Sequence, residues 1–184
     1  MQKVLAGLIL LGWSACLPAS ADPLSGKKQV FLIDNGAGKT LVGNISFSPE
    51  GTFSAYKIDL TIGPFTEHFL SMRPFRCLEG PDKHWCHVPY PYALQRKVSV
   101  GDLTDLEYDL LFIHKGATEY GINMWNGVYY QLRIDGDRLV GELHEMDMGL
   151  LAVPPAEGEL RPVTDKDIHQ AEPDSHWLPR LVIE

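Results

Sequence analysis

Residues 128–143, with the sequence VYYQLRIDGDRLVGEL, decide the fold class of this chain. On each side of Asp135-Gly136, apolar and polar side chains alternate, and this period of two is typical of β-strands with one buried face. Asp-Gly between two alternating runs is the strongest hairpin signal in the sequence. The stretch therefore predicts a β-hairpin, and with it an antiparallel β protein.

Further strand candidates extend from this hairpin in both directions, and residues that favour turns separate them. They are residues 29–33, 41–47, 56–62, 65–72, 97–100 and 106–114. Residues 106–114 are apolar on both faces, which predicts a strand at the centre of a sheet. About eight sequential strands predict a single antiparallel β-barrel or sandwich, and their meandering order favours a lipocalin-like (calycin-like) barrel. The resemblance is architectural, because the Gly-x-Trp of a lipocalin first strand is absent.

Residues 73–96 have a different composition, rich in proline and containing both Cys77 and Cys86. We expect an irregular excursion that a Cys77–Cys86 disulfide holds in place, because two cysteines in an oxidising compartment most simply pair. In the chain-entropy model a loop of this length contributes about 2.5–3 kcal/mol. The alternative is a metal site that combines these cysteines with His84 and His87, although the cysteine spacing is unusual for zinc.

Residues 1–21 have the organisation of a cleavable secretory signal peptide. Lys3 gives a positive start, an apolar run follows, and Ala19 and Ala21 stand where signal peptidase needs small residues. The apolar run is shorter than the roughly 20 residues of a spanning helix, so we expect no transmembrane segment after cleavage. Acylation of Cys16 is an alternative. These features predict a periplasmic or secreted protein.

The remaining chain is predicted to form a β domain over residues 22–163, with a helix or tail over residues 164–184 docked on it. Thr164 fits the N-cap of such a short helix. The sequence carries 16 Lys and Arg against 24 Asp and Glu, and removal of the signal peptide takes away only Lys3. This negative charge disfavours nucleic acid as a partner.

No catalytic motif is complete in the sequence. The glycine-rich run at residues 36–40 lacks the first glycine of a phosphate-binding loop, and His144-Glu145 lacks the second histidine of a zinc-protease helix. A Gly-x-Ser-x-Gly elbow is also absent. We therefore expect a protein without a cofactor and favour a non-enzymatic role, while an acid/base pair that only the fold assembles stays open.

The preferred functional hypothesis is a β-barrel that binds a small apolar or amphipathic ligand, or a protein partner. Aromatic rings supply contact area in such pockets, and neighbouring polar groups supply orientation. The candidate contacts are Tyr120, Trp125, Tyr129 and Tyr130, with Trp85 and Tyr90 at the rim.

Metal handling is the second functional hypothesis. His144, Met146 and Met148 recur with a period of two, so they share one face of a strand. Imidazole and thioether ligands suit copper, and Cu(I) in particular. The region of His84 and His87 is the other candidate for copper or zinc.

Overall fold

The computed structural model describes residues 22–172 and 174–184, so the predicted signal peptide and Cys16 lie outside the described residues. The strands are β1 (Gly26–Ile33), β2 (Lys39–Glu50), β3 (Phe53–Asp59), β4 (Thr66–Phe69), β5 (Pro74–Glu79), β6 (Lys83–His87), β7 (Lys97–Val98), β8 (Phe112–Gly116), β9 (Gly127–Asp135), β10 (Arg138–Met146), β11 (Ile168–Gln170) and β12 (Arg180–Ile183). The helical elements are α1 (Thr104–Asp109) and the 3₁₀ turns η1 (Met124–Asn126) and η2 (Met148–Leu151).

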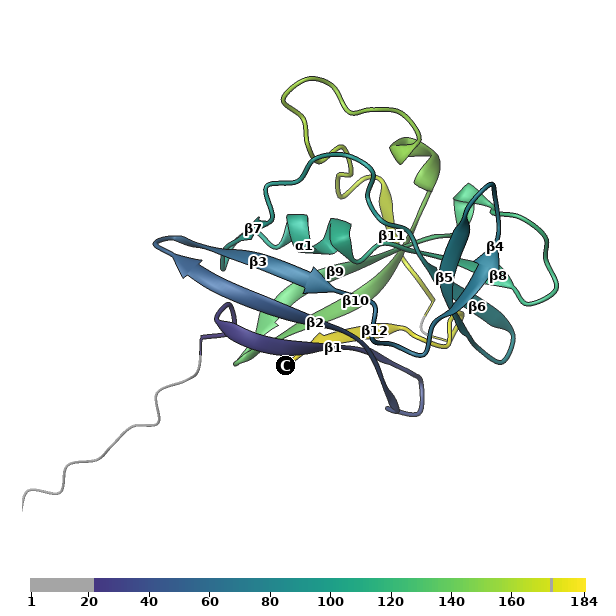
Figure 1. Cartoon of the computed structure of the whole chain (residues 1–184), viewed down its shortest axis with the longest axis horizontal. Coiled ribbons are helices and arrows are strands. Elements are labelled where there is room, and N and C mark those ends of the chain that lie inside the picture. Colours follow the sequence, from purple (N-terminus) through teal and green to yellow (C-terminus); the bar gives the residue numbers. More distant parts are fainter. Residues whose placement is uncertain (1–21, 173) are drawn as a thin grey trace, which may run out of the picture.

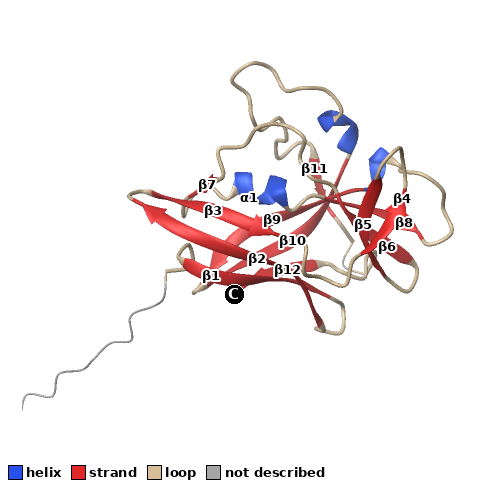
Figure 2. Cartoon of the chain, viewed as in Figure 1, coloured by secondary structure: helices blue, strands red, loops and turns tan. Residues whose placement is uncertain are grey.

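All the strands belong to one antiparallel sheet, so the prediction of a mostly β architecture is confirmed (Figures 1 and 2). The strand order is β4-β5-β6-β8-β9-β10-β12-β1-β2-β3-β7, with β11 paired to β10. One meander contains β4, β5, β6, β8, β9 and β10, and the other contains β1, β2, β3 and β7. Strand β12 lies between β10 and β1 and joins the two. The sheet is not closed, because β4 and β7 at its ends do not pair with each other. A lipocalin-like barrel is thus not confirmed.

Strand β12 occupies the middle of the sheet although it comes after every other strand in the chain. Ile183 pairs with Val30 of β1 on one side and with Leu139 of β10 on the other. Leu181 and Ile183 are both fully buried in the apolar core that the two meanders share. The β12 strand consequently holds the two meanders together by hydrogen bonds and by packing.

The hairpin predicted from residues 128–143 is confirmed. Strands β9 and β10 pair from Asp135–Arg138 at the turn to Gly127–Met146 at the far end. Gly136 occupies the first turn position with a φ of 65°, which is the left-handed region that residues with a Cβ avoid. The turn therefore selects glycine for a backbone reason.

Replacing Gly136 with Ala is expected to destabilise the protein by about 1–2 kcal/mol, the cost of a left-handed backbone for an L-residue. No atom lies within 4 Å of the added Cβ, so backbone strain is the whole effect. Urea denaturation measures the change. Gly101→Ala is the matched control, because Gly101 also has open space but no positive φ. Equal midpoints for the two variants would contradict this explanation.

The prediction of a central strand at residues 106–114 is wrong for its first half, which belongs to the helix α1. Leu103, Leu106 and Leu110 all reach the shared apolar core, and their spacing of three and four is helical. The Asp102 side chain accepts a hydrogen bond from the backbone N–H of Thr104 just before the helix. Strand β8 begins only at Phe112. A helical period inside an apolar run was the signal that the strand interpretation missed.

Helix α1 contacts both β7 and β9, and its Glu107 covers part of an unpaired strand edge. Strand β8 pairs with β9 only at Gly127 and Val128, which leaves the rest of that edge without a neighbouring strand. There the Glu107 carboxylate accepts hydrogen bonds from the Leu132 backbone N–H and the Tyr129 hydroxyl. Burial of Glu107 raises its pKa.

Two other local predictions are corrected. Residues 73–96 are not irregular throughout, because β5 and β6 lie within them and the confirmed Cys77–Cys86 disulfide joins opposite residues of that strand pair. The helix expected after Thr164 is not found in the described part of the tail. The Asp167 side chain accepts hydrogen bonds from the backbone and hydroxyl of Thr164, and this closes a turn before β11.

Candidate metal centre

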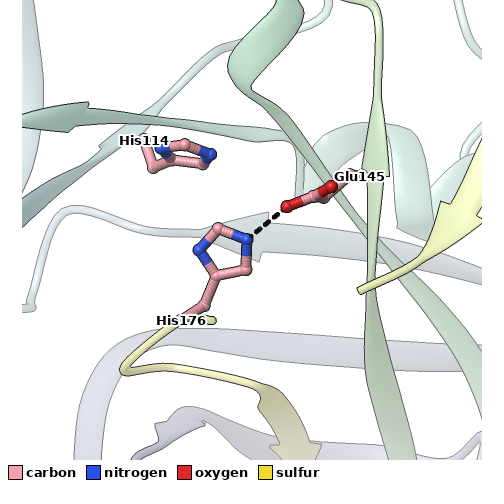
Figure 3. Close-up of side chains that lie close together, drawn as sticks. All are labelled: His114, Glu145 and His176. Atoms are coloured by element: carbon pink, nitrogen blue, oxygen red, sulfur yellow. Dashed lines mark hydrogen bonds and ion pairs between the residues drawn. The ribbon is translucent and has the colours of Figure 1, made fainter. Parts of the chain in front are cut away.

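Three side chains of metal-binding type meet beside the shared apolar core. His114 comes from β8, Glu145 from β10 and His176 from the segment that leads into β12. One ligand atom of each residue lies within 4.8 Å of the other two, and Figure 3 shows the three groups beside one another. The site therefore depends on the pairing of strands that are remote in sequence.

Trp85 forms the apolar floor of this site. It is fully buried and lies directly opposite His114 across the β6–β8 pair. Its ring stacks on His114 with the centroids 5.7 Å apart, and it meets the His176 ring edge-on at 5.4 Å. The Trp85 indole N–H donates to the Tyr130 hydroxyl, which in turn donates to the Leu178 carbonyl two residues beyond His176. Trp85 is thus fixed and restricts both imidazole rings.

Three further contacts position His176. The Asn35 amide donates to the His176 carbonyl at 3.1 Å, and the Lys83 ammonium donates to the Ser175 carbonyl at 3.1 Å. The His176 ring bonds through Nε2 to Glu145 Oε1 at 2.7 Å, drawn as the dashed line in Figure 3. The backbone of His176 is consequently held from β6 and from the β1–β2 turn, and its ring from β10.

The two imidazoles are neutral at neutral pH. Burial lowers the pKa of His114 to about 4, with the neighbouring His176 and Lys83 adding to the effect. Burial also lowers the pKa of His176, and the hydrogen bond to Glu145 opposes that shift. Neutral imidazole is the form that binds metal ions.

The site combines a buried ring with an accessible carboxylate. The His176 side chain is 3% exposed and that of Glu145 is 47% exposed. Nδ1 of His176 is buried and has no hydrogen-bond partner within the described parts of the chain. A pocket of about 350 Å³, bordered by His176, Glu172 and Arg180, also reaches this ring. Solvent can therefore approach the site, although Trp85 and His176 on its inner side are buried.

Two imidazoles and one carboxylate form a donor set suited to zinc and related divalent ions. Bonds of roughly 2.0–2.1 Å to such an ion place the ligand atoms about 3.3 Å apart. The three ligand atoms, which lie within 4.8 Å of one another, would have to move closer together to hold such an ion. Three protein ligands also leave one tetrahedral position for water or another molecule.

The six aromatic residues predicted to bind a ligand do not form one pocket. Trp85 and Tyr130 are fully buried in the shared core, and Tyr129 and Tyr90 are buried in a second apolar cluster. Tyr120 and Trp125 instead lie on the surface, 100% and 75% exposed. Of the six, only Trp85 contacts the candidate metal centre directly, and Tyr130 supports it.

The metal ligands suggested by the sequence are also distributed differently. Met146 and Met148 are buried in the second apolar cluster, whereas the His144 ring bonds to the Glu142 carbonyl. His84 packs on His68, and the His87 ring bonds to the Asp109 carbonyl. These residues do not join the candidate metal centre.

Sequence reasoning missed all three residues of this centre. Glu145 stands between two of the expected ligands, but a strand turns it to the opposite face from His144. His176 lies 31 residues further on, and no local spacing connects it to Glu145. The sequence signal for this centre was compositional only, namely histidines in and near strand-like segments.

The fold and the site together define a class: an antiparallel β protein with one cross-strand disulfide and a candidate two-histidine, one-carboxylate metal centre. Comparison of the chain with protein-family models, with curated proteins and with solved structures gave no match. Within the described residues, no helix has the length and apolar character needed to cross a membrane.

Proposed function

We propose that this is an exported protein that binds a divalent transition-metal ion of the zinc class through His114, Glu145 and His176. The observation that carries the proposal is the convergence of these three groups from three separate parts of the fold. Further contacts support the arrangement, because Trp85 packs against both histidines and two hydrogen bonds hold the backbone at His176 and Ser175.

Export is the second part of the proposal. Residues 1–21 carry the pattern of a cleavable signal peptide. The Cys77–Cys86 disulfide supports the same view, because disulfides persist in oxidising compartments and are rare in the cytosol.

Metal binding is preferred to binding of an apolar ligand because of where the aromatic side chains lie. The residues that would line an apolar pocket are divided between two cores and the surface. The three polar groups of the metal centre, by contrast, already face one another. We therefore prefer metal binding to the apolar-ligand hypothesis. The proposed metal ligands differ from His144, Met146 and Met148, which the sequence pattern suggested.

Zinc titration of the purified protein by calorimetry is the test. His114→Ala and Glu145→Gln should each weaken the affinity of the centre at least about 100-fold, because even indirect changes around a metal commonly cost 10–100-fold. Tryptophan fluorescence supplies a second readout, because Trp85 packs against the centre and Trp177 follows His176 in the chain. Co²⁺ bound at this centre should quench Trp85 fluorescence, since the indole packs against both histidines.

His144→Ala is the matched control, because His144 neighbours Glu145 in sequence but lies on the other face of β10. Its zinc affinity and Co²⁺ quenching should match the wild type. If His144→Ala removes binding while His114→Ala retains it, the ligands are those that the sequence pattern suggested. If neither variant changes the quenching of Trp85, this site does not bind the ion.

A further inference from the structure

A second group of two histidines and a carboxylate lies on the opposite face of β6. His68 belongs to β4, Glu79 to β5 and His84 to β6, three neighbouring strands in Figure 1. Glu79 and His84 face each other directly across the β5–β6 pair. Because side chains alternate along a strand, His84 and Trp85 point to opposite faces. The group therefore shares no residue with the first centre.

The three side chains are connected by short contacts. Nε2 of His68 lies 3.1 Å from Oε1 of Glu79, and the His68 and His84 rings are 4.7 Å apart between centroids. The Thr66 hydroxyl donates to the same Glu79 oxygen at 2.9 Å. Nδ1 of His84 is buried and finds no hydrogen-bond partner among the described residues. One nitrogen in the group thus has an unused lone pair or proton.

The disulfide fixes the strands that carry this group. Cys77 stands two residues before Glu79, and Cys86 stands two residues after His84, so all four side chains lie on one face of the β5–β6 pair. The covalent link prevents these strands from slipping against each other. Thr66 pairs with Cys77 across the β4–β5 ladder and sets the position of His68. The strands that carry the three groups are therefore held in a fixed register.

We propose that His68, Glu79 and His84 form a second binding site for a divalent metal ion of the same class. Imidazole and carboxylate donors are again the ligands such ions take. The groups are gathered less closely than those of the first centre, and the Glu79 side chain is 56% exposed. The charge of Lys115 also acts on His84. The second site consequently binds more weakly and exchanges its ion with solvent faster.

Native mass spectrometry of the purified protein, titrated with ZnCl₂, tests this inference. The wild type should bind two ions, the second at higher zinc concentration. His84→Ala and Glu79→Gln should each bind one ion and still show Co²⁺ quenching of Trp85. His114→Ala should also bind one ion, but with weaker quenching, because His84 points to the face of β6 away from the Trp85 ring. Glu79→Gln preserves shape at an exposed position, so the test holds even where His84→Ala folds poorly.

The outcomes separate the two sites. The second site would be overturned if Glu79→Gln still bound two ions. It would also be overturned if the wild type bound a single ion and His114→Ala bound none. Either result would leave the first site intact. The opposite pattern is a single ion in the wild type that is absent from Glu79→Gln and unchanged in His114→Ala. That pattern would support the second site and contradict the first. His144→Ala should match the wild type in every measurement.

Discussion

Replacing Leu181 with Asn is expected to destabilise the protein by about 3–5 kcal/mol. The change loses the transfer free energy of a buried leucine, about 1.5–3 kcal/mol, and places an amide of similar size in an apolar core at a further cost of about 1–3 kcal/mol. Leu181 is fully buried in β12, between the two meanders. Since domains are typically stable by about 5–15 kcal/mol, this loss is a large share of the folding free energy.

Urea denaturation followed by circular dichroism measures this effect. Arg180→Asn is the matched control, because it introduces the same side chain one residue earlier at an exposed position of the same strand. Its cost should stay below about 1 kcal/mol. Similar midpoints for the two variants would show that β12 contributes little to joining the meanders.

The second large effect is expected at Glu107. Glu107→Ala leaves two buried donors, the Leu132 backbone N–H and the Tyr129 hydroxyl, without their acceptor. Each unsatisfied buried group costs about 1–3 kcal/mol, so we expect a loss of about 2–4 kcal/mol at mildly acidic pH. We expect a change in stability, because the Glu107 carboxylate is the hydrogen-bond acceptor for a β9 backbone N–H that has no partner strand.

The pH dependence at Glu107 has a definite sign. Burial raises its pKa in the folded protein above the ordinary 4.5. The folded state therefore holds a proton that the unfolded state has lost, and stability falls as pH rises through this interval. The favourable contribution of Glu107 is complete below pH 4.5 and is lost above its raised pKa. The cost of Glu107→Ala should accordingly be largest at low pH and shrink toward neutral pH.

Glu107→Gln is the control for this prediction. The amide keeps an acceptor for Leu132 and cannot ionise, so its cost should be smaller, and the variant should gain stability relative to the wild type as pH rises. Denaturation of all three proteins between pH 4.5 and pH 8 provides the comparison. A difference between wild type and Glu107→Gln that is constant with pH, or that moves the other way, would contradict a raised pKa.

Local patterns predicted the local features of this fold. Asp135-Gly136 between alternating runs identified the β9–β10 hairpin, because a two-residue turn and its strands are encoded in consecutive residues. Two cysteines left after an expected signal peptide were enough to predict the Cys77–Cys86 bond. The helix at residues 104–109 was missed because its leucine spacing is hidden in a run that is also apolar at every other position.

Long-range pairing explains what the sequence could not show. Nothing local indicates that β12 enters between β1 and β10, and that insertion is what brings His176 to Glu145. His114 likewise reaches the centre only because β8 pairs with β6, which puts Trp85 beneath it. Four of the six aromatic residues expected to line a pocket are instead buried in the two core clusters, and Tyr120 and Trp125 lie on the surface.

The central place of β12 also limits which parts of the chain can form the sheet independently. In a fragment that stops before residue 180, β1 and β10 would each expose an open edge. Such edges recruit foreign strands, so this fragment should be prone to aggregation. Adding residues 180–183 as a separate peptide would fill the gap by strand addition and should restore one continuous sheet.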